Sequence, residues 1–179
     1  LHEHVRTGDR VVVIGGGRGV TGTIAAKHTG ETGSVVVFEG SAKWTSRTRK
    51  TLQLNEVDEI TEVHHAIVEK AIAAGDQIAE REDTSDQTTP IVKADELPEC
   101  DVLEMDCEGA ELDILRNMRL RPRIILVETH GVFGAPTEDV KDVLTEKGYD
   151  IDRVEIAEER FRELHTEQDV KVITAVRAN

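Results

Sequence analysis

VVVIGGGRGVTG, residues 11–22, decides the expected fold. Residues 11–14 are a continuous apolar run, which is typical of a parallel strand buried on both faces. The glycines that follow permit positive φ angles and let backbone N–H groups approach a ligand. Residues 20–28 then predict a helix. The stretch therefore predicts a strand, a glycine loop and a helix, an arrangement suited to binding a nucleoside cofactor.

The glycines fit two cofactor patterns at once. Gly17, Gly19 and Gly22 give G-x-G-x-x-G, the pattern of dinucleotide-binding loops. Gly15, Gly17 and Gly19 give G-x-G-x-G, which is expected of loops that bind S-adenosylmethionine. Glu39 follows a second expected strand, where a carboxylate can accept hydrogen bonds from the ribose hydroxyls of either cofactor. These residues alone leave the cofactor open.

The rest of the chain alternates between strand and helix patterns. After the first strand, further strands are expected over residues 34–38, 60–68, 101–105, 123–127, 149–156 and 170–177, and further helices over 42–54, 109–118 and 137–147. Ser41 and Thr137 are expected to cap two of the helices, and Gly148 to end the last. Residues 69–99 indicate a loop or small hairpin insertion, with a short helix over 69–74 as the alternative. The alternation predicts a doubly wound α/β sheet.

Composition limits the class of protein. The 179 residues, of which 38% are hydrophobic, predict a single domain over residues 1–179, and the start at Leu1 is consistent with trimming of the N-terminus. No apolar run approaches the roughly 20 residues of a membrane span, so we expect no membrane partner. Cys100 and Cys107 match no zinc or redox spacing, and reduced thiols favour a cytoplasmic location.

The charge is strongly negative. The chain holds 36 acidic and 22 basic residues, a formal net charge of -14. This balance argues against nucleic-acid binding, because phosphate contacts need clustered Lys and Arg. It also fits a halophilic protein, since the salt of its cytoplasm would screen the self-repulsion.

Polar residues follow four of the expected strands. They are the glycine loop, Glu39, the stretch DCEGAE at 106–111, and Glu128-Thr-His130. The carboxyl ends of parallel strands meet at one edge, where such sheets bind ligands, so we expect these segments to lie together. The closely spaced carboxylates of DCEGAE suit a cationic sulfonium better than hydride transfer to NAD.

Two of these residues are candidate general bases for a hydroxyl acceptor, namely Asp106 and His130. Carboxylate and imidazole are also competent metal ligands, so a divalent metal at Asp106, Glu128 and His130 is an alternative. Our expectation is that the site holds no metal.

Several stretches together resemble the FkbM-type family of S-adenosylmethionine-dependent methyltransferases. They are DCEGAE, IILVETHG at 124–131, VVVFEGS at 35–41 and LQLNEVDEITEVHHAIV at 52–68, and the resemblance runs from about residue 11 to 177. It implies a Rossmann-like class I methyltransferase fold: a mostly parallel seven-stranded sheet with helices on both faces and an antiparallel last strand. The chain departs from the family at Val13, where an acid is usual, and at Gly17, where a small polar residue is usual.

The resemblance implies S-adenosylmethionine as cofactor and methyl transfer to an acceptor oxygen. The expected acceptor is a small hydroxylated molecule, and the negative charge predicts no nucleic acid as partner. The implied catalytic residues are Asp106, Glu128 and His130. Arg18 is a candidate partner of the cofactor's carboxylate, and the full set of expected cofactor contacts is Gly15, Gly16, Gly17, Arg18, Gly19, Glu39, Gly40, Ser41, Ala66 and Asp106.

Two alternatives remain at this point. An NAD(P)-dependent oxidoreductase is favoured by the G-x-G-x-x-G pattern, although the chain has no Tyr-x-x-x-Lys set and its one tyrosine, Tyr149, lies beside Gly148. A non-catalytic binding module of the same fold is favoured by Val13 and the unusual loop.

Overall fold

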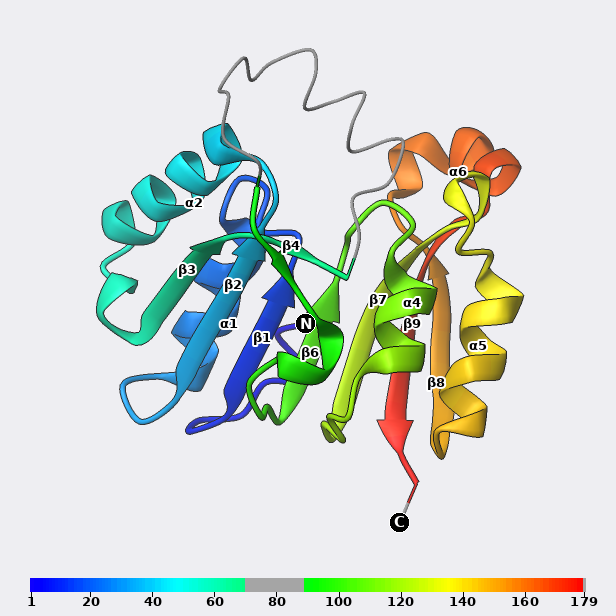
Figure 1. Cartoon of the computed structure of the whole chain (residues 1–179), viewed down its shortest axis with the longest axis horizontal. Helices are drawn as coiled ribbons and strands as arrows, with labels where there is room; N and C mark the ends of the chain where they lie inside the picture. Colours follow the sequence, from blue (N-terminus) through cyan, green and yellow to red (C-terminus); the bar gives the residue numbers. More distant parts are fainter. Residues whose placement is uncertain (70–88, 179) are drawn as a thin grey trace.

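Seven strands form one sheet in the order β3-β2-β1-β6-β7-β9-β8 (Figure 1) in the computed structural model, which describes residues 1–69 and 89–178. The strands of this sheet are β1 (Arg10–Ile14), β2 (Ser34–Glu39), β3 (Thr61–His65), β6 (Val102–Met105), β7 (Ile124–His130), β8 (Tyr149–Ile156) and β9 (Val170–Arg177). The first five in this list run parallel, while β9 pairs antiparallel with both β7 and β8. The predicted sheet with an antiparallel last strand is confirmed.

The strand order reverses at β1. The chain passes from β1 outward to β2 and β3, and then returns to place β6 on the other side of β1. Open α/β sheets bind their ligands outside the carboxyl ends of the strands at such a switch point. The ends of β1, β2, β6 and β7 therefore define the edge at which a site is expected, and we call it the carboxyl edge.

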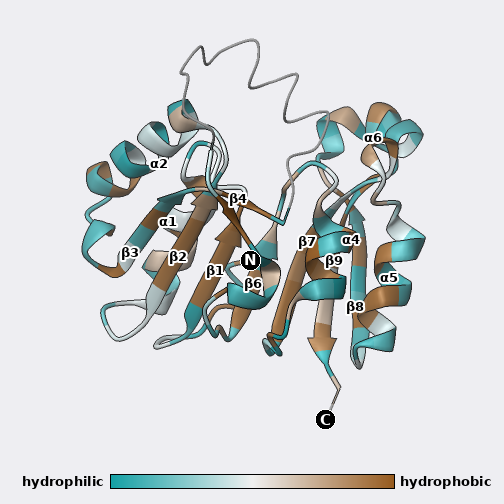
Figure 2. Ribbon diagram, viewed as in Figure 1, coloured by the Kyte–Doolittle hydropathy of each residue, from teal (hydrophilic) through white to brown (hydrophobic). Residues whose placement is uncertain are grey.

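Helices cover both faces of the sheet, because alternate residues of the apolar strands point to opposite sides. Val11 and Val13 of β1 pack in a cluster with Ala25 and Ala26 of α1. Val12 belongs to the cluster on the other face, which includes apolar residues of α4 and α5. Figure 2 shows apolar strands between helices whose outer sides are polar.

The main helices are α1 (Val20–Thr29), α2 (Ala42–Leu54), α4 (Glu111–Asn117), α5 (Thr137–Glu146) and α6 (Arg162–Gln168). Short 3-10 turns lie at Asp58–Ile60, Ala94–Glu96, Gly131–Phe133 and Glu159–Phe161. As predicted, Ser41 caps α2, since its Oγ accepts a hydrogen bond from the Trp44 N–H at 3.4 Å. None of the described helices has both the length and the apolar character needed to cross a bilayer.

The expected strand over 60–68 is wrong in its bounds. It divides at Ala66, whose N–H donates to the Glu39 carbonyl. Beyond it β4 (Ile67–Val68) leaves the main sheet and pairs in parallel with β5 (Ile91–Val92), which forms a second, two-stranded sheet. The helix expected over 69–74 and most of the expected insertion lie outside the described residues.

Three further boundaries differ from the prediction. α4 begins at Glu111 rather than at residue 109, because Glu108 and Gly109 form a turn with positive φ angles of 56° and 104°. β7 runs on to His130, so Glu128 lies within the strand rather than beyond it. Thr137 is the first residue of α5 and not its cap: the Asp169 carboxylate accepts the Thr137 N–H at 2.7 Å.

Candidate active site

The glycine loop joins β1 to α1, and its glycines serve different purposes. Gly15 has a φ of +97°, and a Cβ there would lie 1.8 Å from the carbonyl oxygen of Asp106. A Cβ on Gly16 would lie 2.7 Å from the Val37 side chain. Gly17, with a φ of +50°, has no atom of the described residues within 4 Å of a Cβ position. Gly15 and Gly16 therefore permit close packing, whereas Gly17 borders open space.

Glu39 ends β2 beside this open space. Its carboxylate accepts the Gly17 N–H at 2.7 Å and the Ser41 N–H at 2.8 Å, and the residue is 9% exposed. Each carboxylate oxygen can accept a further hydrogen bond. The loop and the carboxylate lie together, as the sequence predicted, and a hydrogen bond that the sequence did not predict joins them directly. Glu39 keeps acceptor capacity toward the open space.

Two of the other expected cofactor contacts, Gly40 and Ala66, lie beside Glu39. The Ala66 N–H donates to the Glu39 carbonyl, and the Gly40 carbonyl contacts the His65 Nε2 at 3.1 Å. Gly19 is the N-cap of α1.

Arg18 lies over the exposed side of α2. Its guanidinium is 5.8 Å from the Trp44 ring, and the Arg47 guanidinium is 4.5 Å from the same ring. The expected contact of Arg18 with the cofactor's carboxylate stays a prediction.

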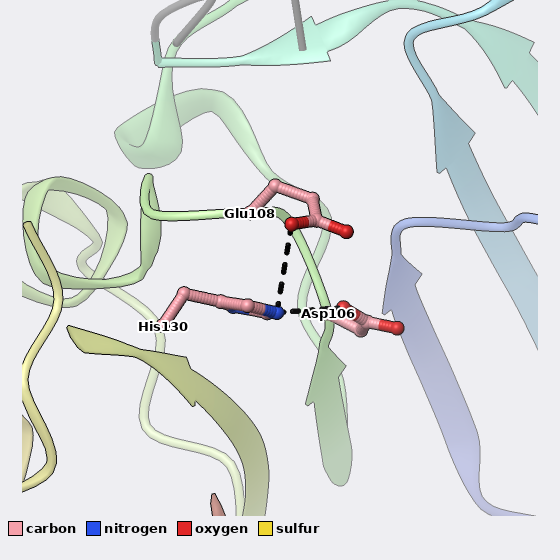
Figure 3. A group of neighbouring side chains, drawn as sticks. All are labelled: Asp106, Glu108 and His130. Carbon is pink, nitrogen blue, oxygen red and sulfur yellow. Dashed lines mark ion pairs between the residues drawn. The ribbon is translucent and has the colours of Figure 1, made fainter. Parts of the chain in front are cut away.

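The glycine loop and Glu39 form the β1–β2 half of the carboxyl edge. The β6–β7 half is formed by the turn after β6, which faces the end of β7. Gly109 makes this close approach possible, because a Cβ there would lie 2.4 Å from the Phe133 carbonyl oxygen, just beyond β7. The positive φ of Glu108 belongs to the same turn. In Figure 3 the side chains of Asp106 and Glu108 both point toward the imidazole of His130.

His130 lies at the centre of four carboxylates. Its Nδ1 is 2.8 Å from the Glu111 carboxylate, and these two side chains are 5% and 0% exposed. Its Nε2 lies 3.6 Å from Asp106, 3.8 Å from Glu108 and 3.7 Å from Glu128. We call Asp106, Glu108, Glu128 and His130 the acidic cluster, with Glu111 behind it.

The carboxylates change the acidity of His130. Burial lowers the pKa of an imidazole, but the hydrogen bond and charge of Glu111, with the charges of Glu108 and Asp106, outweigh this and raise the pKa to about 9. The imidazole is therefore positively charged at neutral pH. Of the two predicted bases, His130 is thus the weaker candidate.

The carboxylates themselves are less acidic than usual. Burial, with the charges of Glu108 and Glu111, raises the pKa of Asp106 to about 6 against the opposing effect of His130. Burial and the charge of Asp106 raise the pKa of Glu128 to about 7. Groups with such values can accept a proton near neutral pH.

Three acidic residues were missed as site residues, although the sequence shows them. Glu108 and Glu111 contact His130, and Glu104 lies on β6 with a buried Oε2 that has no hydrogen-bond partner among the described residues. Burial and the charge of Asp106 raise the pKa of Glu104 well above its usual value. Only the spacing of acids in LEMDCEGAE hinted at this concentration.

Solved structures resemble the whole chain. Fibrillarin of Aeropyrum pernix, in complex with natively bound S-adenosyl-L-methionine, gives a TM-score of 0.62 at 18% identity over 97% of this chain and 68% of its own. A SAM-dependent O-methyltransferase of Thermotoga maritima gives 0.59 at 16% identity, over 98% of this chain and 61% of its own. The ribosomal protein L11 methylase of Lactobacillus delbrueckii subsp. bulgaricus gives a TM-score of 0.60 at 13% identity, over 96% of this chain and 71% of its own. No curated protein matches the chain.

The sheet order, with the glycine loop and the carboxylate after β2, defines a class I methyltransferase fold, as these structures show. A model of the methyltransferase FkbM domain family matches residues 14–151, most of the chain, and the chain belongs to that family. The family and the fold support S-adenosylmethionine as the cofactor, and this favours the glycine pattern that begins at Gly15 over the dinucleotide pattern.

Proposed function

We propose that this methyltransferase domain methylates a hydroxyl oxygen of a small acceptor at the acidic cluster. The observation that carries the proposal is the group of carboxylates around His130, set at the carboxyl edge where Gly15 contacts Asp106. A hydroxyl is a weak nucleophile until a base accepts its proton, and carboxylates within reach of the acceptor can do this.

The residues present fit the cofactor. Gly17 borders open space, and the neighbouring Glu39 carboxylate has free acceptor capacity for ribose hydroxyls. We infer that these two residues hold the nucleoside, and that the acidic cluster balances the positive charge of the sulfonium. S-adenosylmethionine supplies an electrophilic methyl group when it is bound.

Asp106 and Glu128 are the two candidates for the proton acceptor. Both lie beside the His130 Nε2, at 3.6 and 3.7 Å, whereas the Nδ1 of that ring is engaged by Glu111. The imidazole therefore acts as a positioning group that holds the carboxylates. The proton of the acceptor hydroxyl passes to one of them.

The charge supports a small acceptor that is not a polyanion. The chain carries a net charge of -14, and the cluster adds carboxylates at the reacting edge, which would repel phosphate groups. The proposal therefore sets this domain apart from structures of similar fold whose names describe rRNA or protein methylation.

A methyl-labelled cofactor tests the proposal. The full chain is incubated with labelled S-adenosylmethionine and, separately, neutral sugars, hydroxylated metabolites, RNA and protein. We expect label in methyl ethers of small acceptors, and a loss of kcat of about 100-fold in Asp106→Asn or Glu128→Gln. Glu138→Gln, an exposed carboxylate of α5, is the matched control and should keep its rate. Label found only in RNA or protein overturns the proposal, and binding of S-adenosylhomocysteine without any transfer favours the non-catalytic alternative.

A further inference from the structure

The Nε2 of His130 is directed at carboxylates without a hydrogen bond. The side chain is 5% exposed, yet Asp106, Glu108 and Glu128 lie 3.6 to 3.8 Å from this nitrogen. These separations exceed the length of an N–H···O hydrogen bond. Nδ1, by contrast, has its partner at 2.8 Å. Nε2 of this nearly buried side chain therefore has ion-pair contacts but no hydrogen bond among the described residues, a spacing that leaves room for an ion between the groups.

The spacing of the ligand atoms suits a metal ion. One atom each from Asp106, Glu108 and His130 lie within 4.8 Å of one another (Figure 3). Ligands about 2.1 to 2.4 Å from a central ion stand about 3.0 to 3.4 Å apart when adjacent and about 4.2 to 4.8 Å when opposite. The separations of 3.6 and 3.8 Å from Nε2 lie between these two values, so an ion fits with small movements of two partly exposed carboxylates.

Glu111 supplies the support that a metal-binding histidine needs. Such a histidine donates its other ring N–H to a carboxylate, which fixes the ring and its tautomer. Glu111 is fully buried, lies 2.8 Å from Nδ1, and is itself held by the Cys107 N–H at 3.3 Å. This arrangement leaves Nε2 as the nitrogen that faces the carboxylates, and a bound ion would replace the proton that Nε2 carries at neutral pH.

We propose that Asp106, Glu108 and His130 bind a divalent cation that holds the oxygen of the methyl acceptor. Carboxylates suit Mg²⁺ and Mn²⁺, while an imidazole favours the transition metals, so Mn²⁺ best matches the combined set. The ion differs from the expectation of a metal-free site, and it offsets the excess of negative charge at the cluster. Glu108, which the sequence did not single out, becomes a ligand.

The ion gives the carboxylates separate roles. A hydroxyl oxygen on the cation has a lowered pKa, as water bound to a metal does. Its O–H bond would break toward Glu128, which takes the proton because Asp106 is engaged by the ion, and the oxygen would keep the electron pair for its bond to the methyl carbon. The S–CH3 bond of S-adenosylmethionine would break at the same time, with its electron pair left on the sulfur of S-adenosylhomocysteine. This role rests on the proposed O-methylation, whereas the binding of the ion does not.

Binding is tested without cofactor or acceptor. The full chain, treated with EDTA and dialysed, is titrated with Mn²⁺ while the spectrum of the free ion is followed by electron paramagnetic resonance. We expect one Mn²⁺ per chain. The Glu108 side chain is 42% exposed, so Glu108→Gln should fold, and we expect it to weaken binding at least 10-fold. Glu111→Gln, which removes the carboxylate charge that holds His130 Nδ1, should weaken binding about 10- to 100-fold. Glu138→Gln is the control. No bound ion, or unchanged affinity in Glu108→Gln, overturns the site.

The role of the ion is tested separately. Glu128→Gln should bind Mn²⁺ within about threefold of the unaltered chain and yet lose turnover, while Asp106→Asn should lose both. Methyl transfer that continues unchanged in EDTA overturns the role. Bound Mn²⁺ with methyl transfer to a nitrogen acceptor would refute the proposed O-methylation but leave the metal site standing, so the two failures are distinguishable.

Discussion

The two halves of the carboxyl edge treat their carboxylates differently. At the β1–β2 half, the Glu39 carboxylate accepts hydrogen bonds from two backbone N–H groups, at 2.7 and 2.8 Å. At the β6–β7 half, three carboxylates lie 3.6 to 3.8 Å from the Nε2 of His130. In the first half, backbone N–H groups of the chain hold the carboxylate in place. The second gathers like charges whose burial raises the pKa of Asp106 and Glu128. Under the proposed function, the first half holds a neutral part of the ligand, while the second is arranged around positive charge.

Gly15 is where the two halves meet, and its replacement should have the largest effect. In Gly15→Ala the Cβ would lie 1.8 Å from the Asp106 carbonyl, in a backbone that also has positive φ. We expect the free energy of unfolding to fall by at least about 3 kcal/mol, because backbone rather than a flexible side chain must move. Urea unfolding followed by circular dichroism measures this.

Gly17→Ala is the matched control for that experiment. It has the same positive sign of φ but open space at the Cβ position, so we expect a loss of only about 1 kcal/mol. The folded variant should nevertheless bind S-adenosylhomocysteine more weakly, because the methyl group enters the open space. Equal destabilisation of the two variants would contradict the distinction between packing and ligand-facing glycines.

Glu39→Gln and Glu128→Gln should separate the halves by function. Loss of the charged acceptor at Glu39 removes about 1.5 to 3 kcal/mol of hydrogen bonding, which corresponds to roughly 10- to 100-fold in Kd for S-adenosylhomocysteine. Glu128→Gln should leave that Kd within about threefold and lower kcat instead. Isothermal titration calorimetry and initial-rate kinetics provide the two readouts. If both variants changed the same constant, the division of the edge would be wrong.

The fold was predictable because its central strands are buried on both faces. β1, β2, β6 and β7 appear in the sequence as apolar runs, and the order of motifs placed their ends at one edge. The break at Ala66 was not predictable, since it depends on where the register with β2 ends, at Glu39 opposite His65. An apolar pattern shows that a strand exists but not how long its neighbour is.

The site was predictable only in part for a similar reason. Asp106, Glu128 and His130 follow from their positions at strand ends. The contact of Glu108 with His130 depends on a turn in which a glutamate adopts a φ of +56°, a conformation that the residue type does not suggest. Glu111 is an acid in the first turn of a helix, where the helix dipole alone explains its presence. Only the structure shows that its carboxylate contacts the Nδ1 of His130.

Asp169 holds the backbone next to the end of β7, and its replacement should have the smallest effect on stability among these variants. Its carboxylate accepts the Thr137 N–H at 2.7 Å and contacts Lys171 at 3.0 Å, while its carbonyl accepts the Gly131 N–H next to His130. Burial opposes ionisation, but the hydrogen bonds from Thr137 and Lys171 outweigh it and lower the pKa of Asp169. A lowered pKa contributes stability above the unfolded value of about 3.9, which is lost as pH falls through the folded value.

Asp169→Asn should therefore cost about 1 kcal/mol at pH 7, the usual contribution of a helix cap, and asparagine tolerates the positive φ of 52° at this position. The difference in unfolding free energy from the unaltered chain should shrink as the pH falls from about 4 through the lower pKa of the folded state, below which Asp169 is protonated in both states. Urea unfolding at a series of pH values measures it. A difference that stays constant from pH 7 to 3 would mean that the side-chain shape, and not its charge, holds the start of α5. In that case the β6–β7 half, like the β1–β2 half, would owe its support to hydrogen-bond geometry, and the contrast between them would be confined to the acidic cluster itself.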